Sequence, residues 1–354
     1  MPQQFQNKKQ IALATLILFT AVSGCAKKAS DDPVEYSFVV VGCNRMDKGD
    51  VDVATNPSTA NLPQLDRTYD DISKLTPKPD YLFFAGDMVY GYEMDSNKLA
   101  AEFMAWRKHY EESPAAKAGI KLVAIPGNHE TEDTAKLAFP LAEEVWMKVM
   151  SPYIDGSNGP HAGGPDSLAT DQSRLTYSFD FHDTHFVVMN TDPVGQDAHV
   201  PAHWIASDLV AARKAGAKHI FAIGHKPAFS FDGAPSGLVA GNRGDFWGAM
   251  EANHAEAMLS AHNHVYYRFQ PHASLPGNGH TWMVIAGNGG SPLEKDVTQK
   301  EHFYGFTLVS VLKSGKVIVK SYGRDLPAEG YAAACPADKY PTTLRDSLDI
   351  TWKN

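Results

Sequence analysis

The stretch Tyr81-Leu-Phe-Phe-Ala-Gly-Asp-Met-Val-Tyr90 decides how the rest of the chain is interpreted. A mostly apolar run ends in Gly86 and Asp87, and this pattern predicts a buried β-strand that leads into a loop. In open α/β sheets, ligands bind at such carboxyl ends of strands. A buried carboxylate is costly without a partner. Asp87 therefore indicates a metal ion or a hydrogen-bond network, with a loop-capping aspartate as the alternative.

Residues that can bind metals follow other apolar runs in the same manner. Cys43-Asn44 follows Tyr36–Val41, Asn128-His129 follows Lys121–Ile125, His225 follows Lys218–Ile223, and His262 and His264 follow Met258–Ala261. A single histidine at a strand end usually has a structural role, but so many at the ends of different strands predict one shared site at one edge of the sheet. Histidine and carboxylate ligands suit Zn, Fe or Mn. One carboxylate can also serve two metal ions about 3.5–4 Å apart.

The remaining periodicity predicts an α/β domain over residues 36–354. Strand, helix and strand in succession, with Leu62–Leu75 as the first helix, imply a parallel crossover. Further helices are expected at Asn97–Glu112, Leu137–Met150, Pro201–Ala215 and Asp245–Ala257, a further strand at Trp282–Ala286, and hairpins at Thr176–Phe181 with His185–Asn190 (a three-residue turn) and at Phe303–Leu312 with Lys316–Tyr322. No internal repeat or linker divides the domain.

Two loops interrupt this regular order. Residues 132–174 form a predicted insertion, and its part Ser151–Asp171 is rich in Pro, Gly and Ser. Long loops of this kind are commonly functional, so we expect a lid or specificity loop over the site. Gly233–Gly244 is a second, glycine-rich loop that we expect to shape substrate choice.

The N-terminus predicts export. Lys8 and Lys9 precede the apolar run Ile11–Val22 and the small residues before Cys25, as in a secretory signal peptide. The run is shorter than a membrane-spanning helix requires. Val22-Ser23-Gly24-Cys25 resembles a bacterial lipobox, which implies a signal peptide at 1–24, a lipid on Cys25, a tether at 25–35 and a membrane-anchored lipoprotein of a bacterial envelope. A plain signal peptide cut near Gly24 is the alternative.

Charge and cysteine content narrow the possible partners. The net charge is −9 and no basic stripe occurs, so nucleic acid is not an expected partner. Cys43 and Cys335 remain after Cys25, and an exported protein could join them in a disulfide. We favour a reduced Cys43, because it lies at a strand end that has another use.

Several motifs together resemble the calcineurin-like metallophosphoesterases. They are Gly86-Asp87, Gly127-Asn128-His129-Glu130, Gly224-His225 and Ala261-His262-Asn263-His264, and the resemblance spans roughly Tyr36 to Tyr322. It is closest to the purple acid phosphatase branch. Asp87-Met-Val-Tyr90 is similar to that branch's Asp-x-x-Tyr, His262 to Arg268 is similar to its His-x-His-x-Tyr-Glu-Arg, and Trp282 to Gly290 is similar to its later strand that ends in Gly-x-Gly-Gly.

This resemblance implies a fold, a cofactor and roles for the residues. The fold would be two packed mixed β-sheets flanked by helices, in the α/β class. Asp87 would bridge two divalent or trivalent metal ions (Fe, Zn or Mn). Asn128, His225 and His262 would complete one metal site, and His264 and Tyr90 would belong to the other. His129 would lie beside the phosphate of a small phosphorylated substrate, where it could donate a proton to the leaving alkoxide or stabilise the phosphate oxygens.

The first motif departs from the family's pattern. Cys43 stands where the family has an aspartate ligand, and Arg45 stands where many relatives have histidine. An arginine is always protonated and cannot be a ligand, so the Cys43 thiolate or the Asn44 carbonyl is the candidate, and Arg45 is a candidate for binding substrate phosphate. The alternative is a weakened or lost first metal site.

These observations leave two functions from different classes. The favoured one is an exported phosphoesterase that uses a metal-activated water. The alternative is a metal-depleted surface lipoprotein that binds a phosphorylated ligand without turnover. A serine hydrolase has no support, because the chain lacks a Gly-x-Ser-x-Gly elbow.

The lipobox resemblance makes a direct prediction about the mature N-terminus. The exported protein should carry lipid on Cys25 and separate with membranes, because more than one acyl chain gives stable anchoring. Cys25→Ser should abolish the modification and release the protein into the soluble fraction. Mass spectrometry of the mature N-terminus checks this, and an unmodified Cys25 in the wild-type protein would rule it out.

Overall fold

A computed structural model of the chain describes residues 32–231, 237–271, 279–295, 298 and 300–352. The chain divides into two units, Met1–Asp32 and Pro33–Asn354, and the fold described below is that of the second unit. The predicted signal peptide, Cys25 and most of the predicted tether lie outside the described residues, as do residues 232–236 of the glycine-rich loop. In the part that is described, no helix has the length and apolar character needed to span a membrane.

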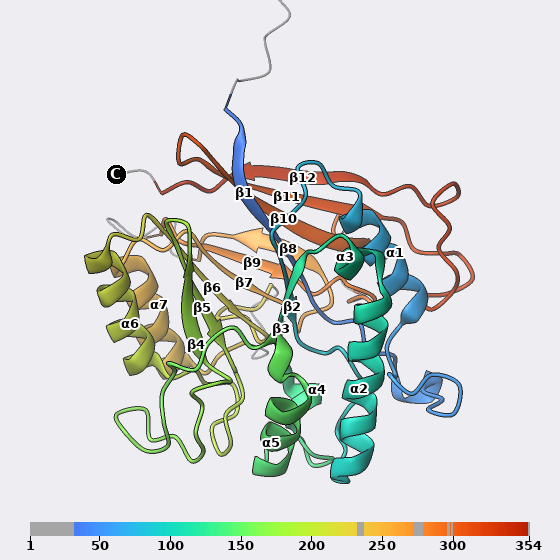
Figure 1. Cartoon of the computed structure of the whole chain (residues 1–354), viewed down its shortest axis with the longest axis horizontal. Helices are drawn as coiled ribbons and strands as arrows, with labels where there is room; N and C mark the ends of the chain where they lie inside the picture. The colour runs from blue at the N-terminus through green and yellow to red at the C-terminus, as the bar shows by residue number, and fades with distance from the viewer. Residues whose placement is uncertain (1–31, 232–236, 272–278, 296–297, 299, 353–354) are drawn as a thin grey trace, which may run out of the picture. The chain divides into compact units, whose positions relative to one another are not determined.

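Two mixed sheets form the centre of this unit (Figure 1). The first sheet has six strands in the order β12 (Thr343–Asp349), β11 (Val317–Arg324), β10 (Tyr304–Leu312), β1 (Val34–Val41), β2 (Tyr81–Ala85) and β3 (Lys121–Ile125). Strands β1, β2 and β3 are parallel, whereas β10, β11 and β12 add antiparallel pairs. The parallel strands therefore deliver their carboxyl ends to one edge.

The second sheet repeats this arrangement. Its six strands lie in the order β4 (Tyr177–Phe181), β5 (Thr184–Met189), β6 (His219–Gly224), β7 (Ala257–Ser260), β9 (Trp282–Ala286) and β8 (Tyr266–Phe269). Strands β5, β6, β7 and β9 are parallel, and antiparallel strands close both edges. Both sheets are thus mixed, as the resemblance implied.

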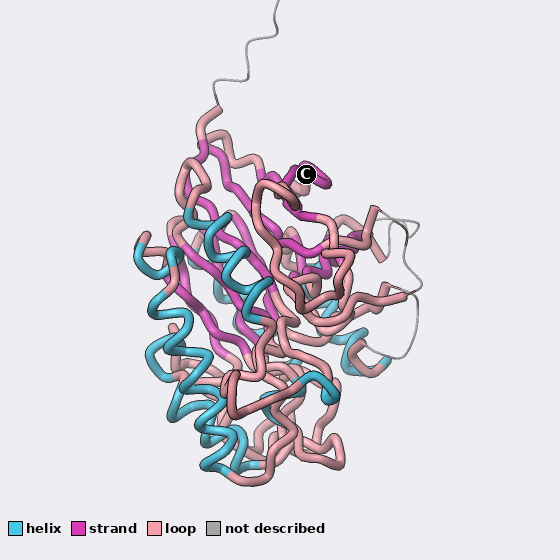
Figure 2. The backbone as a smooth tube through the Cα atoms, turned by 90° about the vertical axis from the view of Figure 1, so that its right-hand side faces the viewer, coloured by secondary structure: helices cyan, strands magenta, loops and turns pink. Residues whose placement is uncertain are grey.

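Helices cover the outer face of each sheet, and this gives four layers. The helices are α1 (Leu62–Ser73), α2 (Ser96–Glu112), α3 (Pro114–Lys117), α4 (Asn128–Thr131), α5 (Pro140–Val149), α6 (Ala202–Ala215) and α7 (Ala240–Ala252), with short 3₁₀ turns η1 (Lys48–Asp50) and η2 (Ser151–Tyr153). Helices α1, α2, α3 and α5 pack on the first sheet, and α6 and α7 pack on the second, on opposite sides of the unit (Figure 1). Figure 2 shows the same helices in a second view, with loops gathered below the strands.

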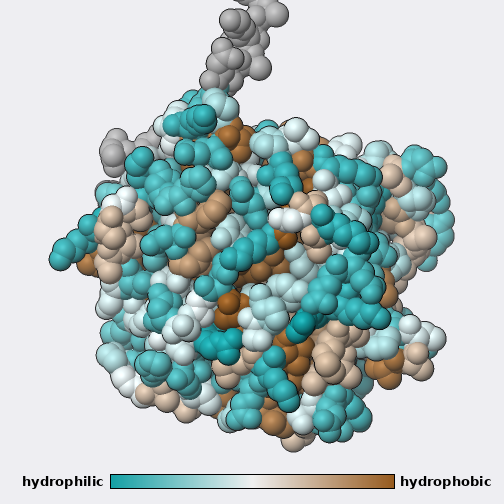
Figure 3. Space-filling model, in the orientation of Figure 1, coloured by the Kyte–Doolittle hydropathy of each residue, from teal (hydrophilic) through white to brown (hydrophobic). Residues whose placement is uncertain are grey.

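Aromatic side chains fill the space between the two sheets. The Phe38 ring lies 5.0–5.5 Å from the rings of Phe83, Phe186 and Phe221, all in edge-to-face geometry. These residues alternate along their strands with residues that face the helices, such as Val39 and Val41, because side chains of a strand point to alternate faces. The outer surface in the view of Figure 3 is mostly hydrophilic, with hydrophobic residues in separate small areas. The continuous apolar runs of the sequence are therefore strands buried on both faces.

The structure confirms most predicted elements and corrects some. The helix predicted at Asp245–Ala257 is wrong at both ends, because α7 begins at Ala240, inside the predicted glycine-rich loop, and residue 257 already belongs to β7. The turn between β4 and β5 has two residues, not three. Strands β8 and β12 were not predicted. Most of β12 is exposed or partly exposed, so it lacks the apolar alternation that marks a half-buried strand.

The insertion at 132–174 also forms hydrogen bonds with β4 and α6. Asp166 accepts hydrogen bonds from the backbone N–H groups of His203 and Trp204 and so caps the start of α6. Asn158 exchanges two hydrogen bonds with Ser178 of β4. The loop Ser151–Asp171 is held on α6 and β4 by these bonds, and its predicted function as a lid stays a prediction.

Candidate active site

The loops that follow the parallel strands of both sheets meet at one place. Cys43, Asp87 and His262, which follow β1, β2 and β7, all have left-handed backbone conformations, with φ of 56°, 53° and 64°. Such conformations are uncommon outside glycine and are often found at functional sites. The Ala261 N–H donates to the His225 carbonyl at 2.9 Å, and the Cys43 N–H donates to the Gly86 carbonyl at 2.9 Å. The backbone therefore ties strand ends that lie far apart in the sequence.

The Glu130 carboxylate organises the first two strand ends. Its Oε2 accepts from the N–H groups of Asp87 (2.9 Å) and Gly127 (2.7 Å). Its Oε1 accepts from the N–H groups of Met88 (2.7 Å) and Val89 (3.2 Å). The loops approach so closely that a Cβ at Gly127 would lie 2.7 Å from the Asp87 nitrogen. Only glycine fits there, and Asp87 and α4 are brought together as a result.

His225 links one oxygen of the buried Asp87 carboxylate to the side chains of Asn128 and His262. The His225 Nε2 lies 3.1 Å from Asp87 Oδ1 and 3.0 Å from the Asn128 Oδ1. The His262 Nδ1 lies 3.1 Å from the same Asn128 oxygen and 3.2 Å from His225 Nε2. The predicted ligands Asp87, Asn128, His225 and His262 are therefore neighbours in space.

Hydrogen bonds to fixed partners orient these groups. His225 Nδ1 lies 2.7 Å from the Ala85 carbonyl, and a carbonyl only accepts, so this nitrogen carries a proton and Nε2 faces the Asp87 and Asn128 oxygens. The Asn128 Nδ2 donates to the Tyr92 hydroxyl at 2.5 Å, which turns the amide oxygen toward the histidines. Hydrogen-bond acceptors thus face one another across about 3 Å, and a cation between them would satisfy them all.

The donor set and its spacing fit a metal ion. Ligands about 2.1 Å from a metal lie roughly 3.0 Å apart in octahedral and roughly 3.4 Å apart in tetrahedral geometry. The observed separations of 3.0–3.2 Å fall in this range. Four pairs among Asp87 Oδ1, Asn128 Oδ1, His225 Nε2 and His262 Nδ1 therefore have the spacing of metal ligands, with His225 and Asn128 at the centre of the group.

A second group of side chains surrounds the other Asp87 oxygen. His129 Nε2 lies 3.9 Å from Asp87 Oδ2, and His264 Nε2 lies 4.0 Å from it. Each imidazole has its Nδ1 against a carbonyl, that of Tyr90 at 2.5 Å and that of Pro292 at 2.7 Å. The Arg45 Nε also lies 4.0 Å from Oδ2. Lone pairs and one cation therefore face this side of the carboxylate.

Cys43 contributes the only sulfur. Its thiol, the Asp87 carboxylate and the His225 ring offer ligand atoms that all lie within 4.8 Å of one another, and the sulfur accepts the His262 N–H at 3.1 Å. Cys43 and Cys335 are both free thiols in the structure. Burial and the nearby Asp87 raise the pKa of Cys43 well above its usual range, so a thiolate forms there only beside a cation.

Two predicted site residues have other contacts. The Asn44 NH₂ group donates to the carbonyls of Asn61 and Gly289, whereas its side-chain oxygen is buried with no hydrogen-bond partner among the described atoms, so its role as a ligand stays a prediction. Tyr90 meets the site through its backbone carbonyl at His129. Tyr92, which sequence reasoning missed, lies nearer: its ring centroid is 4.0 Å from that of His129 and its hydroxyl holds Asn128. Tyr92 stands two positions after the predicted Tyr90 in the sequence, and this second tyrosine could have been considered as a site residue.

The pKa values of several groups in the site depart from their ordinary values in solution. Burial opposes ionisation of Asp87, but the neighbouring imidazoles, His225 foremost, outweigh it and hold the pKa of Asp87 well below its usual range. Burial lowers the pKa of His129 to about 3, so this ring is neutral near neutral pH. Burial and Asp87 raise the pKa of Glu130 to about 7, while bonds from backbone N–H groups favour the ionised form.

A cavity of about 200 Å³ opens beside the candidate ligands. It is lined by Tyr92, Asn128, Glu132, Lys136, Asp197, Ala198, Lys226, Gly237 and His262. The Lys226 ammonium lies 2.5 Å from Asp192, 2.7 Å from Asp197 and 3.4 Å from Glu132. These three carboxylates are spaced to hold a metal ion, but Lys226 already supplies their cation.

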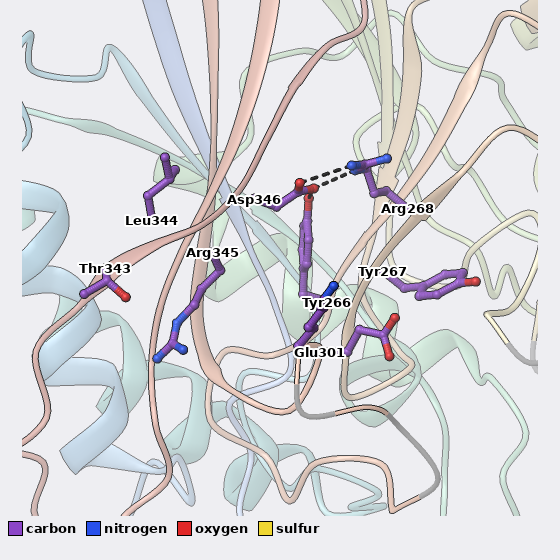
Figure 4. A pocket seen from close by; sticks show the side chains of 9 residues that line it. Tyr266, Tyr267, Arg268, Glu301, Thr343, Leu344, Arg345 and Asp346 are labelled. Atoms are coloured by element: carbon purple, nitrogen blue, oxygen red, sulfur yellow. Dashed lines mark hydrogen bonds and ion pairs between the residues drawn. The ribbon is translucent and has the colours of Figure 1, made fainter.

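A larger cavity of about 660 Å³ lies elsewhere, between the edge strands β8 and β12 (Figure 4). Arg268 and Tyr266 both donate to the Asp346 carboxylate in its wall, so these charges are paired. None of the candidate metal ligands lines this cavity. Its size therefore does not make it the active site.

The fold and the convergent donors define an α/β protein of two mixed sheets with a candidate metal centre at their common edge. The chain belongs to the calcineurin-like phosphoesterase family, whose model matches residues 38–266. Members of this family are typically dimetal hydrolases of phosphoester bonds. No curated protein matches the chain.

Solved structures with the same fold are distant in sequence. A purple acid phosphatase from yellow lupin (Lupinus luteus) seeds has 15% identity and a TM-score of 0.59, over 89% of this chain and 53% of that one, so the chain spans about half of its length. A dimetal phosphatase from Danio rerio has 12% identity and a TM-score of 0.56, over 91% and 100% of the two chains. GAP50, the anchor in the inner membrane complex of Plasmodium, has 11% identity and a TM-score of 0.53, over 90% and 89%.

The Glu130 clamp generates a stability prediction. Glu130→Gln keeps the shape of the side chain but turns an NH₂ group toward backbone donors. Each donor left without an acceptor costs roughly 1–3 kcal/mol, so the free energy of unfolding should fall by about 2–5 kcal/mol. Urea unfolding measures this, with Glu144→Gln on the exposed face of α5 as a control that should change it by under about 0.5 kcal/mol. Equal stability of both variants would show that the carboxylate charge is not needed.

Proposed function

We propose that this chain hydrolyses phosphate esters at a two-metal centre assembled on Asp87. The observation that carries the proposal is the position of the Asp87 carboxylate, whose two oxygens face different sets of imidazole nitrogens. When bound, two metal ions would lower the pKa of a coordinated water and neutralise phosphate oxygens. Fe, Zn and Mn all suit this donor set.

The side chains divide into two groups in this proposal. Asn128, His225 and His262 would hold one ion with Asp87 Oδ1. His264, with Asp87 Oδ2, would hold the other. Family membership and the short distances between acceptor atoms support these roles. Tyr92 would fix the orientation of the Asn128 amide through its hydroxyl.

His129 would move a proton at Nε2. Its Nδ1–H is committed to the Tyr90 carbonyl, and burial keeps the ring neutral, so Nε2 starts without a proton. It would first accept a proton from a reactant and then donate it to the leaving alkoxide. This order refines the predicted role as a proton donor.

The first motif would serve the metal centre in an unusual way, with a cysteine in place of an aspartate. The Cys43 thiolate would replace the aspartate of the family, since its sulfur lies in the same group as Asp87 and His225. Arg45 cannot bind a metal, but its buried Nε has no hydrogen-bond partner among the described atoms. A phosphate oxygen of the substrate would supply that partner.

A second candidate function is binding of a phosphorylated ligand without turnover at a metal-depleted site. The replacement of the aspartate ligand by Cys43 favours it. The fold also occurs in a protein described as an anchor, GAP50, so the fold alone does not imply catalysis. The intact set of Asp87, Asn128, His225 and His262 favours the phosphoesterase instead.

Export and lipid anchoring complete the proposal. They rest on the lipobox resemblance at Val22–Cys25, which lies outside the described residues. Membrane attachment through Cys25 would place the phosphoesterase in the bacterial envelope, facing the periplasm or the cell exterior.

Two substitutions separate metal holding from proton transfer. Asp87→Asn should remove most metal and abolish turnover, because the bridging charge is lost. His129→Ala should keep the metal but lower kcat by about 10²–10⁴-fold, the usual contribution of general acid–base catalysis. Metal analysis and hydrolysis of phosphate esters, with Mn, Zn or Fe added, check both. A normal rate and metal content in Asp87→Asn, or metal loss in His129→Ala, would contradict these assignments.

Variants of Cys43 distinguish the two candidate functions. If its thiolate is a ligand, Cys43→Ala should lose one metal ion and spare the other, whereas Cys43→Asp should keep or raise activity and shift the preference toward harder ions such as Mn. Metal content and rate measured together check this. Cys335→Ala is the matched control, because that buried thiol lies against the Arg67 and α1 region. Unchanged metal and rate in Cys43→Ala would show that Cys43 only packs.

A further inference from the structure

Lys136 is an unpaired cation held beside the candidate active site. It is exposed, and no carboxylate of the described residues lies within ion-pair distance of its ammonium. Its Nζ lies 3.2 Å from the centroid of the Tyr92 ring, a favourable cation–π position. Tyr92 in turn holds Asn128 and packs against His129. One aromatic ring therefore separates the ammonium from two candidate active-site residues.

Hydrogen bonds within the loop fix the backbone around Lys136. The Lys136 residue has a left-handed conformation, with φ of 65°. The Asp133 side chain accepts from the N–H groups of Ala135 and Leu137, and the Lys136 N–H donates to the Asp133 carbonyl. A bridge between Glu132 and Ala138 closes the loop. A non-glycine residue holds such a conformation only where its surroundings impose it.

The cavity that Lys136 lines is small, and Lys136 is the lysine of its wall that forms no ion pair with a described carboxylate. Its volume of about 200 Å³ corresponds to roughly seven water molecules at about 30 Å³ each, enough for a phosphate group and a few more atoms. Of the two lysines in its wall, Lys226 is engaged by three carboxylates, those of Glu132, Asp192 and Asp197, whereas the Lys136 ammonium remains available to a ligand. Asn128 and His262 form the inner wall, so an anion in this cavity would lie between Lys136 and the candidate metal ligands.

We propose that Lys136 is a specificity-determining residue that binds an oxygen of the substrate phosphate and favours phosphomonoesters over phosphodiesters. This inference rests on the proposed phosphoesterase function. A phosphomonoester carries about −1.5 to −2 charges at neutral pH, whereas a diester carries a single negative charge. An additional cation therefore attracts the monoester more strongly. A diester would also have to place a second ester group in the small cavity.

Two measurements on metal-loaded protein test the proposal. One is the affinity for inorganic phosphate by calorimetry. The other is kcat/KM for p-nitrophenyl phosphate and for bis(p-nitrophenyl) phosphate. Lys136→Met should lower phosphate affinity and monoester kcat/KM about tenfold and change diester kcat/KM less than about threefold. Lys136→Arg should retain most of both, and Lys148→Met, at an exposed lysine of α5 outside the cavity, should behave as wild type.

The outcomes separate this inference from the proposed function. Equal loss for both esters, or no loss of phosphate affinity, in Lys136→Met would overturn the role of Lys136 while the phosphoesterase stands. Wild-type protein that binds phosphate through Lys136 but hydrolyses neither ester would overturn the phosphoesterase and leave anion recognition by Lys136 in place. Wild-type protein that does not bind phosphate would overturn the role of Lys136.

Discussion

The Glu130 carboxylate is the interaction on which the site depends. It accepts hydrogen bonds from Asp87, Met88, Val89 and Gly127, and so it joins the loops after two adjacent parallel strands. Without it, several buried N–H groups would lack acceptors and the left-handed backbone at Asp87 would be unsupported. Glu130 therefore sets the position of the Asp87 carboxylate through backbone hydrogen bonds.

The two sheets add a second constraint, because each supplies only part of the ligand set. Asp87 and Asn128 follow strands of the first sheet, whereas His225 and His262 follow strands of the second. The aromatic layer around Phe38 sets how closely the sheets approach. Separations near 3 Å between candidate ligand atoms from different sheets therefore depend on core packing. A substitution in that core would change these separations.

Proton positions decide what the cluster can do. Carbonyl groups at Ala85, Tyr90 and Pro292 accept from the Nδ1 atoms of three histidines, so their Nε2 atoms present lone pairs to the two sides of Asp87. This arrangement suits cations between the rings and carboxylate. It also explains why His129 starts as a proton acceptor. Around this centre, Lys226 is engaged by carboxylates, whereas Lys136 lies on the Tyr92 ring without an ion pair among the described residues.

The sequence by itself determined most of the strands and the residues at their carboxyl ends. Apolar runs that end in Gly86-Asp87 or Gly224-His225 are local patterns, and periodicity and end residues can be interpreted without the fold. The tertiary structure alone decided that Tyr92 orients Asn128, that Lys226 neutralises its carboxylates, that the Asn44 amide turns to backbone carbonyls and that Lys136 lies over the cavity. These contacts join segments through packing of two sheets and through loop conformations, and neither leaves a periodic signal in the chain. Strand β12 escaped prediction for a related reason, since an edge strand with mostly exposed residues has no apolar pattern.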